Sequence, residues 1–459
     1  MNFYDTIAAL SSPMGKGGVA VIRICGAEAV QIAQRVFKCA SGKSIADLSP
    51  NVMAYGRIYL NGRVIDDGLC VKFLAPRSFT GEDTVEINCH GGIYVTQKVL
   101  EAVFCAGARP AEAGEFTRRA FVNGKMGLSQ AEALGTLLEA NNDEQIDLAR
   151  SVMGGKIKDA CEDIYRKLIS LVASVYARVD YPEEDLAELS VEEMLNRAWA
   201  ILSQIDGLIA TYKTGHAVME GLRTVIVGKP NVGKSSLYNR LVGRDAAIVT
   251  EIEGTTRDLL TEKVSLGRVT LNLVDTAGIR DTDDTVEKIG VERARASLGD
   301  AELVLAVFDN SRELTEEDYE IMDYLNAVNS TKIAVINKND ENSMISDEEI
   351  AKRFTHVVRI SAKYENNVDE LRALIESLYI NEMIDIRNDA VLINARQNAS
   401  LAKTREHLLL AIEALEAGLS ADLAGVDIEL AMSCLSEVDG REVDEDIVHE
   451  IFSHFCVGK

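Results

Sequence analysis

One segment restricts the fold of this chain more than any other: Gly228-Lys-Pro-Asn-Val-Gly-Lys-Ser235, which has the pattern G-x-x-x-x-G-K-[ST]. It follows an apolar run at 224–227 and precedes a helical segment, which is the strand–loop–helix context that this motif requires. In such a loop the glycines turn backbone N–H groups toward phosphates, Lys234 adds charge, and the Ser235 hydroxyl can ligate Mg²⁺. The segment predicts an α/β nucleotide-binding domain.

Further motifs follow in the order expected of a guanine-nucleotide site. They are Gly254-Thr-Thr-Arg-Asp258, Asp275-Thr-Ala-Gly278, Asn337-Lys-Asn-Asp340 and Ser361-Ala-Lys363. The carboxylate of Asp340 can accept hydrogen bonds from N1–H and the 2-amino group of guanine. Adenine cannot donate that pair, and sites built this way discriminate on the order of 10⁴-fold.

We therefore predict that the chain binds GTP. The predicted contact residues are Asn231, Val232, Gly233, Lys234, Ser235, Ser236, Thr250, Glu251, Ile252, Glu253, Gly254, Thr255, Thr256, Asp275, Thr276, Ala277, Gly278, Asn337, Lys338, Asp340, Ser361, Ala362 and Lys363.

The group that would orient the attacking water is not evident from the motifs. Ras-like proteins use a glutamine directly after the D-x-x-G element, and here that position is Ile279, which cannot orient water. The loop that follows offers four carboxylates, and the motifs leave the choice among them open: Asp281, Asp283, Asp284 and Glu287. Arg257 and Arg280 lie nearby, but a surface role explains both.

The rest of the chain predicts a multidomain protein. Residues 1–120 mix short strand-like runs with glycine turns and predict an α+β domain, whereas 121–219 and 381–459 are helical in pattern. Residues 220–380 alternate apolar strands with helices, as in a parallel, doubly wound sheet. The simplest account is one all-α domain interrupted by an inserted α/β domain.

Composition narrows the function classes. There are 48 Lys and Arg against 73 Asp and Glu, a net charge of −25, which makes the chain a poor general binder of nucleic acid or anionic membranes. The 8 cysteines form no C-x-x-C pair, and no apolar run approaches the ~20 residues needed to span a bilayer. We expect a cytoplasmic protein.

These motifs resemble the MnmE (TrmE) family of tRNA-modification GTPases over essentially the whole length. The segments that carry the resemblance are GKPNVGKSS, IVTEIEGTTRD, DTAGIRDTDDTVEKIG, GGVAVIRICG, SFTGEDTVE, CHGG, GEFTRRAFVNGKMGLSQAEA and the C-terminal FCVGK. The resemblance implies an inserted Ras-like G domain whose GTP hydrolysis depends on K⁺, with Glu287 orienting water and Lys234 as a further catalytic residue. It implies K⁺ ligands at Asn231, Thr250, Ile252 and Thr255, and Mg²⁺ ligands at Ser235 and Thr256.

For the N-terminal domain, the resemblance implies a tetrahydrofolate-binding fold that also forms a homodimer. The one-carbon donor would be a 5,10-methylene- or 5-formyl-tetrahydrofolate, held by Arg23, Glu86, Lys125 and Lys459. Carboxylates suit a pterin edge, and basic side chains suit an anionic glutamate tail. Cys456 matches a C-terminal cysteine of the family and is a candidate for a chemical role, although a buried structural thiol is the plainer reading.

The resemblance also implies partners. The family works as a heterotetramer with MnmG (GidA), an FAD-binding protein that would provide most of the tRNA contact, and adds an aminomethyl or carboxymethylaminomethyl group at C5 of wobble uridine. Two alternatives remain at this stage. One is a regulatory or ribosome-assembly GTPase without modification chemistry, and the other is a folate-dependent aminomethyltransferase that GTP merely regulates.

Overall fold

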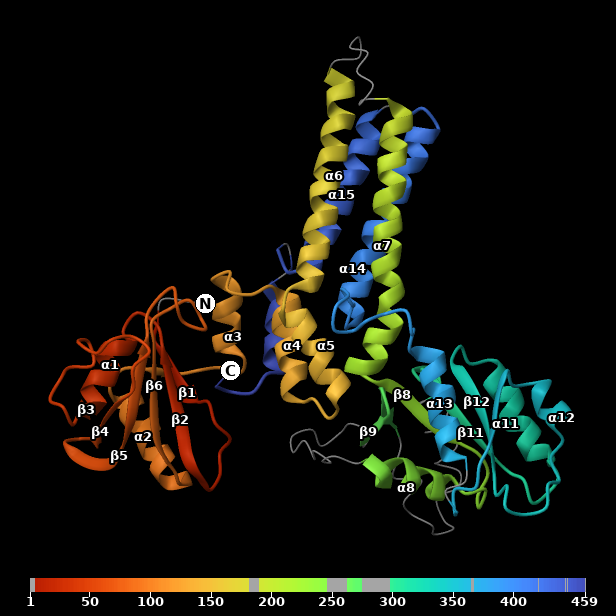
Figure 1. Ribbon diagram of the computed structural model, residues 1–459, viewed down its shortest axis with the longest axis horizontal. Helices are drawn as coiled ribbons and strands as arrows, with labels where there is room; N and C mark the ends of the chain where they lie inside the picture. The colour runs from red at the N-terminus through yellow and green to blue at the C-terminus, as the bar shows by residue number, and fades with distance from the viewer. Residues whose placement is uncertain are drawn as a thin grey trace. The chain divides into compact units, whose positions relative to one another are not determined.

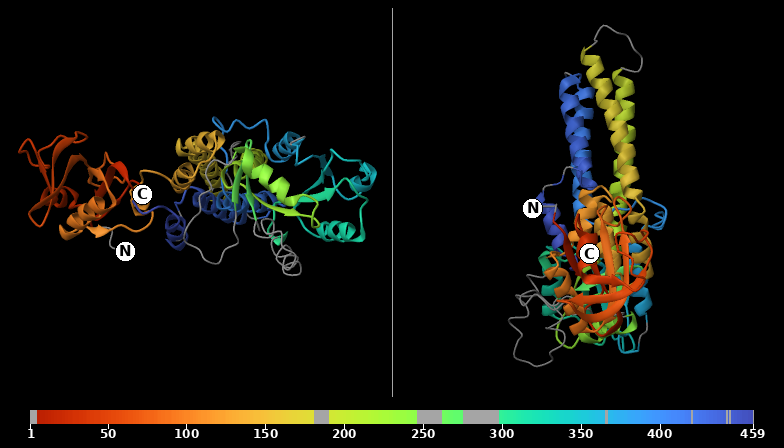
Figure 2. Two further views of the ribbon diagram at one scale, coloured as in Figure 1. Left: turned by 90° about the horizontal axis from the view of Figure 1, so that it is seen from below. Right: turned by 90° about the vertical axis from the view of Figure 1, so that its left-hand side faces the viewer.

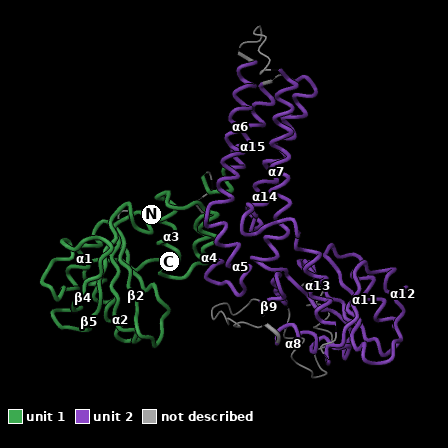
Figure 3. The backbone as a smooth tube through the Cα atoms, viewed as in Figure 1, with its two compact units in different colours: residues 1–135, 436–459 green, residues 136–435 purple. Residues whose placement is uncertain are grey.

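The computed structural model describes residues 5–180, 190–245, 262–274, 298–364, 367–419, 421–441, 443 and 445–458, which form two compact units. Residues 1–135 and 436–459 make up the first unit and residues 136–435 the second (Figure 3). This division differs from the domain boundaries expected from the sequence, because the last 24 residues group with the N-terminal part of the chain. The domain boundaries expected from the sequence, after residues 120, 219 and 380, stay a prediction.

The first unit is built on a seven-stranded sheet in the order β3-β4-β5-β6-β2-β1-β7, antiparallel except for the β1–β7 pair. Alternate residues of its central strands are apolar and buried, and they pack against the helices α1 and α2 (Figure 1). The strands are β1 (Ile7–Leu10), β2 (Gly17–Cys25), β3 (Phe37–Cys39), β4 (Ala54–Leu60), β5 (Arg63–Phe73), β6 (Thr84–Gly91) and β7 (Arg109–Pro110). The helices that lie wholly or mostly in this unit are α1 (Ala29–Val36), α2 (Ile93–Cys105), α3 (Glu115–Val122), α4 (Leu128–Leu138) and α16 (Glu445–Ser453).

The helices of the second unit include four long ones that run side by side, visible in the right-hand view of Figure 2 as yellow, yellow-green and blue ribbons. Helix α6 has an apolar stripe at the expected spacing, and the described members of that stripe are buried: Ile157, Cys161, Ile164, Leu168, Leu171 and Val175. The helices are α5 (Asp143–Met153), α6 (Lys156–Asp180), α7 (Val191–Met219), α14 (Ala395–Glu416) and α15 (Ala421–Val438). Throughout the described ranges, every helix is too short or too polar to cross a bilayer.

Between α7 and α14 the chain forms a six-stranded sheet in the order β13-β12-β11-β8-β10-β9, parallel except at β9. The apolar runs at 224–227, 270–274, 303–308 and 332–336 lie in or directly beside its strands. The strands are β8 (Leu222–Val227), β9 (Glu262–Leu266), β10 (Val269–Leu273), β11 (Leu303–Asp309), β12 (Thr331–Asn337) and β13 (His356–Arg359). The helices are α8 (Lys234–Asp245), α11 (Glu316–Asn326), α12 (Asp347–Ala351) and α13 (Val368–Tyr379).

The C-terminal end of α7 joins this sheet through a half-buried histidine. His216 Nδ1 lies 2.7 Å from Glu220 Oε2, and His216 Nε2 lies 2.7 Å from Glu302 Oε1, just before β11. Glu302 also accepts a hydrogen bond from the backbone N–H of Arg223, and the ring of Tyr212 lies 5.3 Å from the imidazole. Burial alone would lower the pKa of His216, but the two glutamates raise it to about 9.

This junction predicts a pH-dependent stability. The folded-state pKa of His216, about 9, lies above the ordinary histidine value of 6.5, so the ion pairs stabilise the fold fully below pH 6.5. That contribution, on the order of 2 kcal/mol, is lost as the pH rises through 9. Chemical denaturation at pH 6.5 and pH 9.5 should therefore show a larger drop in the midpoint for wild type than for His216→Gln. An equal drop in both proteins would refute this assignment.

Candidate functional site

The phosphate loop lies between β8 and α8. Its backbone conformation explains why it needs glycine at position 233. Gly233 has φ +100°, and a Cβ at this position would lie 2.1 Å from Asn337 Nδ2. Asn231 also takes a left-handed conformation, with φ +63°, which asparagine tolerates better than most residues. Ser235 and Ser236 follow in the first turn of α8, where backbone N–H groups favour anions.

Lys234 is folded across this loop. Its Nζ donates hydrogen bonds to the carbonyl oxygens of Gly228 at 2.7 Å and Lys229 at 2.8 Å. Burial lowers the pKa of Lys234, because a desolvated ammonium group lacks part of its hydration. A phosphate group bound in the loop would give this ammonium group an anionic partner.

A cavity of about 460 Å³ lies beside the loop, at the carboxyl ends of the parallel strands. Asn337 connects its two sides, because Nδ2 donates to Val232 O at 2.9 Å and Oδ1 accepts from Ala362 N at 3.0 Å. The Ser361 hydroxyl donates to Asp340 Oδ1, which orients that carboxylate. The cavity is lined by Gly233, Ser236, Asn239, Arg240, Asn337, Lys338, Asp340, Glu341, Ser361, Ala362 and Lys363.

The cavity thus joins residues of three predicted motifs. Lys338 completes the wall and pairs with Asp309 Oδ2 at 2.7 Å. The remaining predicted nucleotide, metal and catalytic positions lie outside the described residues: Thr250, Glu251, Ile252, Glu253, Gly254, Thr255, Thr256, Asp275, Thr276, Ala277, Gly278 and Glu287.

A second group of predicted residues lies in the first unit. Arg23 on β2 and Glu86 on β6 are directly opposite in register, and Arg23 Nε and Nη2 each lie 2.9 Å from Glu86 Oε1. The guanidinium lies over the rings of Phe79 and Phe116, with its central carbon 5.8 Å and 5.5 Å from their centroids. This face of the sheet therefore carries a partly exposed acid–base pair flanked by aromatic rings.

The structure places Lys125 differently from Arg23 and Glu86. Its Nζ donates a hydrogen bond to Pro76 O at 2.9 Å, at the start of the loop that carries Phe79. This hydrogen bond ties Lys125 to the loop that carries Phe79, whose ring lies beside the Arg23 guanidinium.

The C-terminal tail reaches the Arg23–Glu86 pair. Gly458 O accepts hydrogen bonds from Ser11 Oγ at 3.0 Å and from Arg23 Nη1 at 3.5 Å, and Val457 forms a β-bridge with Ala113. Cys456 is exposed, and its carbonyl accepts a hydrogen bond from Gly114 N at 3.5 Å. Lys459 lies outside the described residues and follows Gly458 directly.

Gly458 allows this docking, and its substitution should release the tail. Its φ is +102°, and a Cβ would lie 2.0 Å from Leu10 O, a rigid backbone atom. We expect Gly458→Ala to increase C-terminal trimming by carboxypeptidase roughly tenfold, since strain of this kind costs on the order of 1–3 kcal/mol. Gly18→Ala is the matched control, because a Cβ there meets nothing within 4 Å. Equal trimming of both variants would contradict the docking.

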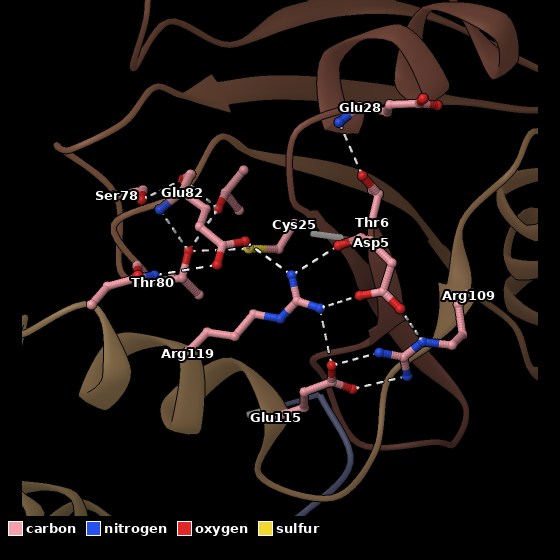
Figure 4. Close-up of polar contacts among 12 residues, drawn as sticks. Asp5, Thr6, Cys25, Glu28, Ser78, Thr80, Glu82, Arg109, Glu115 and Arg119 are labelled. Carbon is pink, nitrogen blue, oxygen red and sulfur yellow. Dashed lines mark hydrogen bonds and ion pairs between the residues drawn. The ribbon is translucent and has the colours of Figure 1, made fainter. Parts of the chain in front are cut away.

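Among the described residues of the first unit, Arg119 has the most buried charge, and no motif predicted its role. Arg119 on α3 has a side chain only 1% exposed, and it binds three carboxylates: Asp5 at 2.8 Å, Glu82 at 2.9 Å and Glu115 at 3.0 Å (Figure 4). Arg109 binds Asp5 and Glu115 as well, each at 2.7 Å. This network fastens the loop of Glu82, and with it Phe79, to α3.

The network sets the ionisation of its members. The Arg109 guanidinium lowers the pKa of Asp5. Burial would raise the pKa of Glu115, but hydrogen bonds from Arg109, the backbone and Arg119 lower it overall. The segment GEFTRRAF gives no indication that Arg119 has a partner 114 positions away at Asp5 and another 37 positions away at Glu82.

The fold and the site define a guanine-nucleotide-binding protein of the P-loop class, with a second candidate site in its N-terminal unit. Residues 6–125 match the family described as GTP-binding protein TrmE N-terminus, and residues 128–456 match the MnmE helical domain. The chain belongs to the MnmE (TrmE) family of tRNA modification GTPases.

Individual relatives are similar to this chain over nearly its full length. The tRNA modification GTPase MnmE of Lactobacillus delbrueckii subsp. bulgaricus is 42% identical over 99% of this chain and 98% of its own. The protein of the same name from Clostridioides difficile is 40% identical over 99% of each chain. That of Thermoanaerobacter pseudethanolicus is 41% identical over 99% of this chain and 100% of its own.

Proposed function

We propose that this chain hydrolyses GTP and, with an FAD-binding partner, adds an aminomethyl or carboxymethylaminomethyl group to C5 of wobble uridine in tRNA. The observation that carries the proposal is the full-length similarity to tRNA modification GTPases, 42% over 99% of the chain. The guanine cavity built around Asp340 supports the nucleotide, since every described residue predicted to contact GTP lies in it or in the adjoining loop.

The proposed hydrolysis uses Mg²⁺ and K⁺. The Ser235 hydroxyl and Thr256 suit Mg²⁺, and oxygens of Asn231, Thr250, Ile252 and Thr255 suit K⁺, because hard cations prefer oxygen ligands. A cation at this position neutralises charge that develops on the phosphate oxygens during phosphoryl transfer. Lys234 neutralises charge from within the loop, and Glu287 orients the attacking water.

Substitution of Asn231 tests the role of K⁺. Asn231→Gly removes the carboxamide but keeps the left-handed backbone, because glycine adopts φ +63° without strain. GTP hydrolysis is measured in KCl and in NaCl at equal ionic strength. The proposal expects wild type to be faster in KCl and the variant to lose that difference while it still binds GDP. Equal wild-type rates in both salts would overturn the K⁺ assignment alone.

The N-terminal unit is proposed to bind a 5,10-methylene- or 5-formyl-tetrahydrofolate and to form a homodimer. Glu86 offers acceptors to the donor edge of a pterin, and Phe79 offers a ring to stack on. Arg23, Lys125 and Lys459 offer positive charge to the glutamate tail. The folate would supply the one-carbon unit. Cys456, exposed on the tail that reaches Arg23, is a candidate for a chemical role there.

Equilibrium dialysis with 5-formyl-tetrahydrofolate tests this site. Glu86→Gln keeps the size of the side chain and removes its charge, and we expect it to weaken binding, whereas Glu101→Gln on the surface of α2 should not. Wild-type protein that retains no folate would contradict the site.

The proposals for the partner and the cellular location rest on the net charge of the chain and on its proposed tRNA substrate. With a net charge of −25, this chain is poorly suited to hold tRNA by itself, so the FAD-binding MnmG subunit is proposed to contribute most of the contact within a heterotetramer. A protein that acts on tRNA in this way is expected in the cytoplasm. Tight binding of tRNA by this chain alone at physiological salt would contradict that division of labour.

A further inference from the structure

One wall of the base cavity is held by a residue outside the predicted motifs. Arg240 lies on α8, six residues after Lys234, and is half-buried. Its Nε donates to Ala362 O at 2.9 Å, and its Nη2 donates to Lys363 O at 3.0 Å. A planar guanidinium fork is suited to two neighbouring carbonyl oxygens, and a lysine ammonium cannot reproduce this geometry.

These bonds complete the support of the loop 361–363. Asn337 Oδ1 already accepts the N–H of Ala362 at 3.0 Å, so Asn337 and Arg240 hold the same residue through its N–H and its carbonyl. Ser361 and Ala362 are almost fully buried, at 1% and 2% exposure. The loop therefore has little freedom while both supports remain.

The position of this loop determines the direction of the Asp340 carboxylate. The Ser361 hydroxyl donates to Asp340 Oδ1, and both residues line the cavity together with Arg240. A loop that moves carries the hydroxyl with it and leaves Asp340 less well oriented toward a base. Because α8 begins at the phosphate loop, Arg240 also links the base side of the cavity to the phosphate side.

We propose that Arg240 is a positioning residue for base selectivity: through the carbonyls of Ala362 and Lys363 it holds the loop whose Ser361 orients Asp340. The inference rests on the proposed guanine site and goes beyond it, since none of the nucleotide motifs includes this residue. Arg240 acts here through the loop and the serine rather than on the base itself.

Binding of two nucleotides that differ only in the 2-amino group tests the proposal. GDP has this group and inosine diphosphate lacks it. The ratio of their dissociation constants therefore measures how much the hydrogen bond from the 2-amino group to Asp340 contributes to binding. We expect Arg240→Ala to weaken GDP binding roughly tenfold, as expected when hydrogen bonds from a charged donor are lost. Inosine diphosphate should lose less, so that the ratio falls at least about threefold.

Two further variants separate positioning from general damage. Arg240→Lys keeps the charge but replaces the two-nitrogen fork with a single ammonium group, and its ratio should lie between those of wild type and Arg240→Ala. Arg353→Ala removes an arginine of the same α/β region that binds Asp323 on the surface, and it should keep the wild-type ratio. Thermal unfolding of each variant, with and without GDP, identifies any that does not fold.

The outcomes are distinct. A lower ratio in folded Arg240→Ala, partly restored by lysine, supports the proposal. Equal weakening of both nucleotides, or no change in either, overturns it, because Asp340 would then be oriented without Arg240. If wild type itself does not distinguish GDP from inosine diphosphate or ADP, the guanine site fails, and that result differs from failure of the Arg240 proposal alone.

Discussion

Replacement of Lys234 with alanine should lower the rate of GTP hydrolysis at saturating GTP by about 10²- to 10³-fold, which is the usual loss when one group that stabilises transition-state charge is removed. The physical reason is the position of the ammonium group. It lies inside the phosphate loop, partly desolvated, and among the described residues it donates to the carbonyls of Gly228 and Lys229. No other described lysine lies within the loop itself except Lys229, whose Nζ binds Asp318 at 2.9 Å instead.

Phosphate release in single-turnover and steady-state assays measures this loss. Lys352→Ala removes an exposed lysine of the same region, after α12, and should keep the wild-type rate. If Lys234→Ala hydrolyses GTP within about threefold of wild type, the loop does not perform the role that phosphoryl-transfer chemistry assigns to it.

Asp340→Asn should change the preferred base from guanine to xanthine. Asparagine presents one acceptor and one donor, whereas the aspartate presents two acceptors. Guanine would then have a donor opposite a donor, and we expect the affinity for GDP to fall by about 10³- to 10⁴-fold. Xanthine has a carbonyl oxygen in place of the 2-amino group, so xanthosine diphosphate should bind the variant better than wild type.

Competition between labelled GDP and unlabelled nucleotides measures this change in base preference. Asp300→Asn is the matched control, because Asp300 is 74% exposed and pairs only at 3.7 Å with Arg223. A variant that loses GDP without any gain for xanthosine diphosphate would show that Asp340 supports the loop through Ser361 more than it reads the base.

The nucleotide site could be predicted in part from the sequence because its chemistry lies in short contiguous motifs. The described motifs at 228–235, 337–340 and 361–363 follow or begin at the ends of the parallel strands β8, β12 and β13. Parallel strands present their carboxyl ends at one edge of a sheet. Asn337 and Ser361 therefore meet at the cavity although they are separated along the chain. Arg240 could not be recognised in this way, since an arginine on a helix surface gives no indication of which carbonyls it meets.

In the N-terminal unit, by contrast, the residues of the candidate site and of the Arg119 network do not lie in one contiguous motif. Arg23 and Glu86 are brought together by strand register, which periodicity does not determine. The partners of Arg119 come from the start of the chain, a loop and its own helix, so the network depends on tertiary structure. The grouping of residues 436–459 with this unit also depends on tertiary packing, because α16 buries Phe452 against Leu128 and Ala131 of α4.

The central claim is that this chain uses its GTP site in the modification of tRNA. The most direct test is mass spectrometry of tRNA nucleosides from cells that lack the chain, complemented with wild type or Lys234→Ala. We predict loss of a C5-aminomethyl-type wobble uridine, restored by wild type and not by the variant. An unchanged nucleoside profile in the cells that lack the chain would contradict the account and would leave a GTPase that regulates another process.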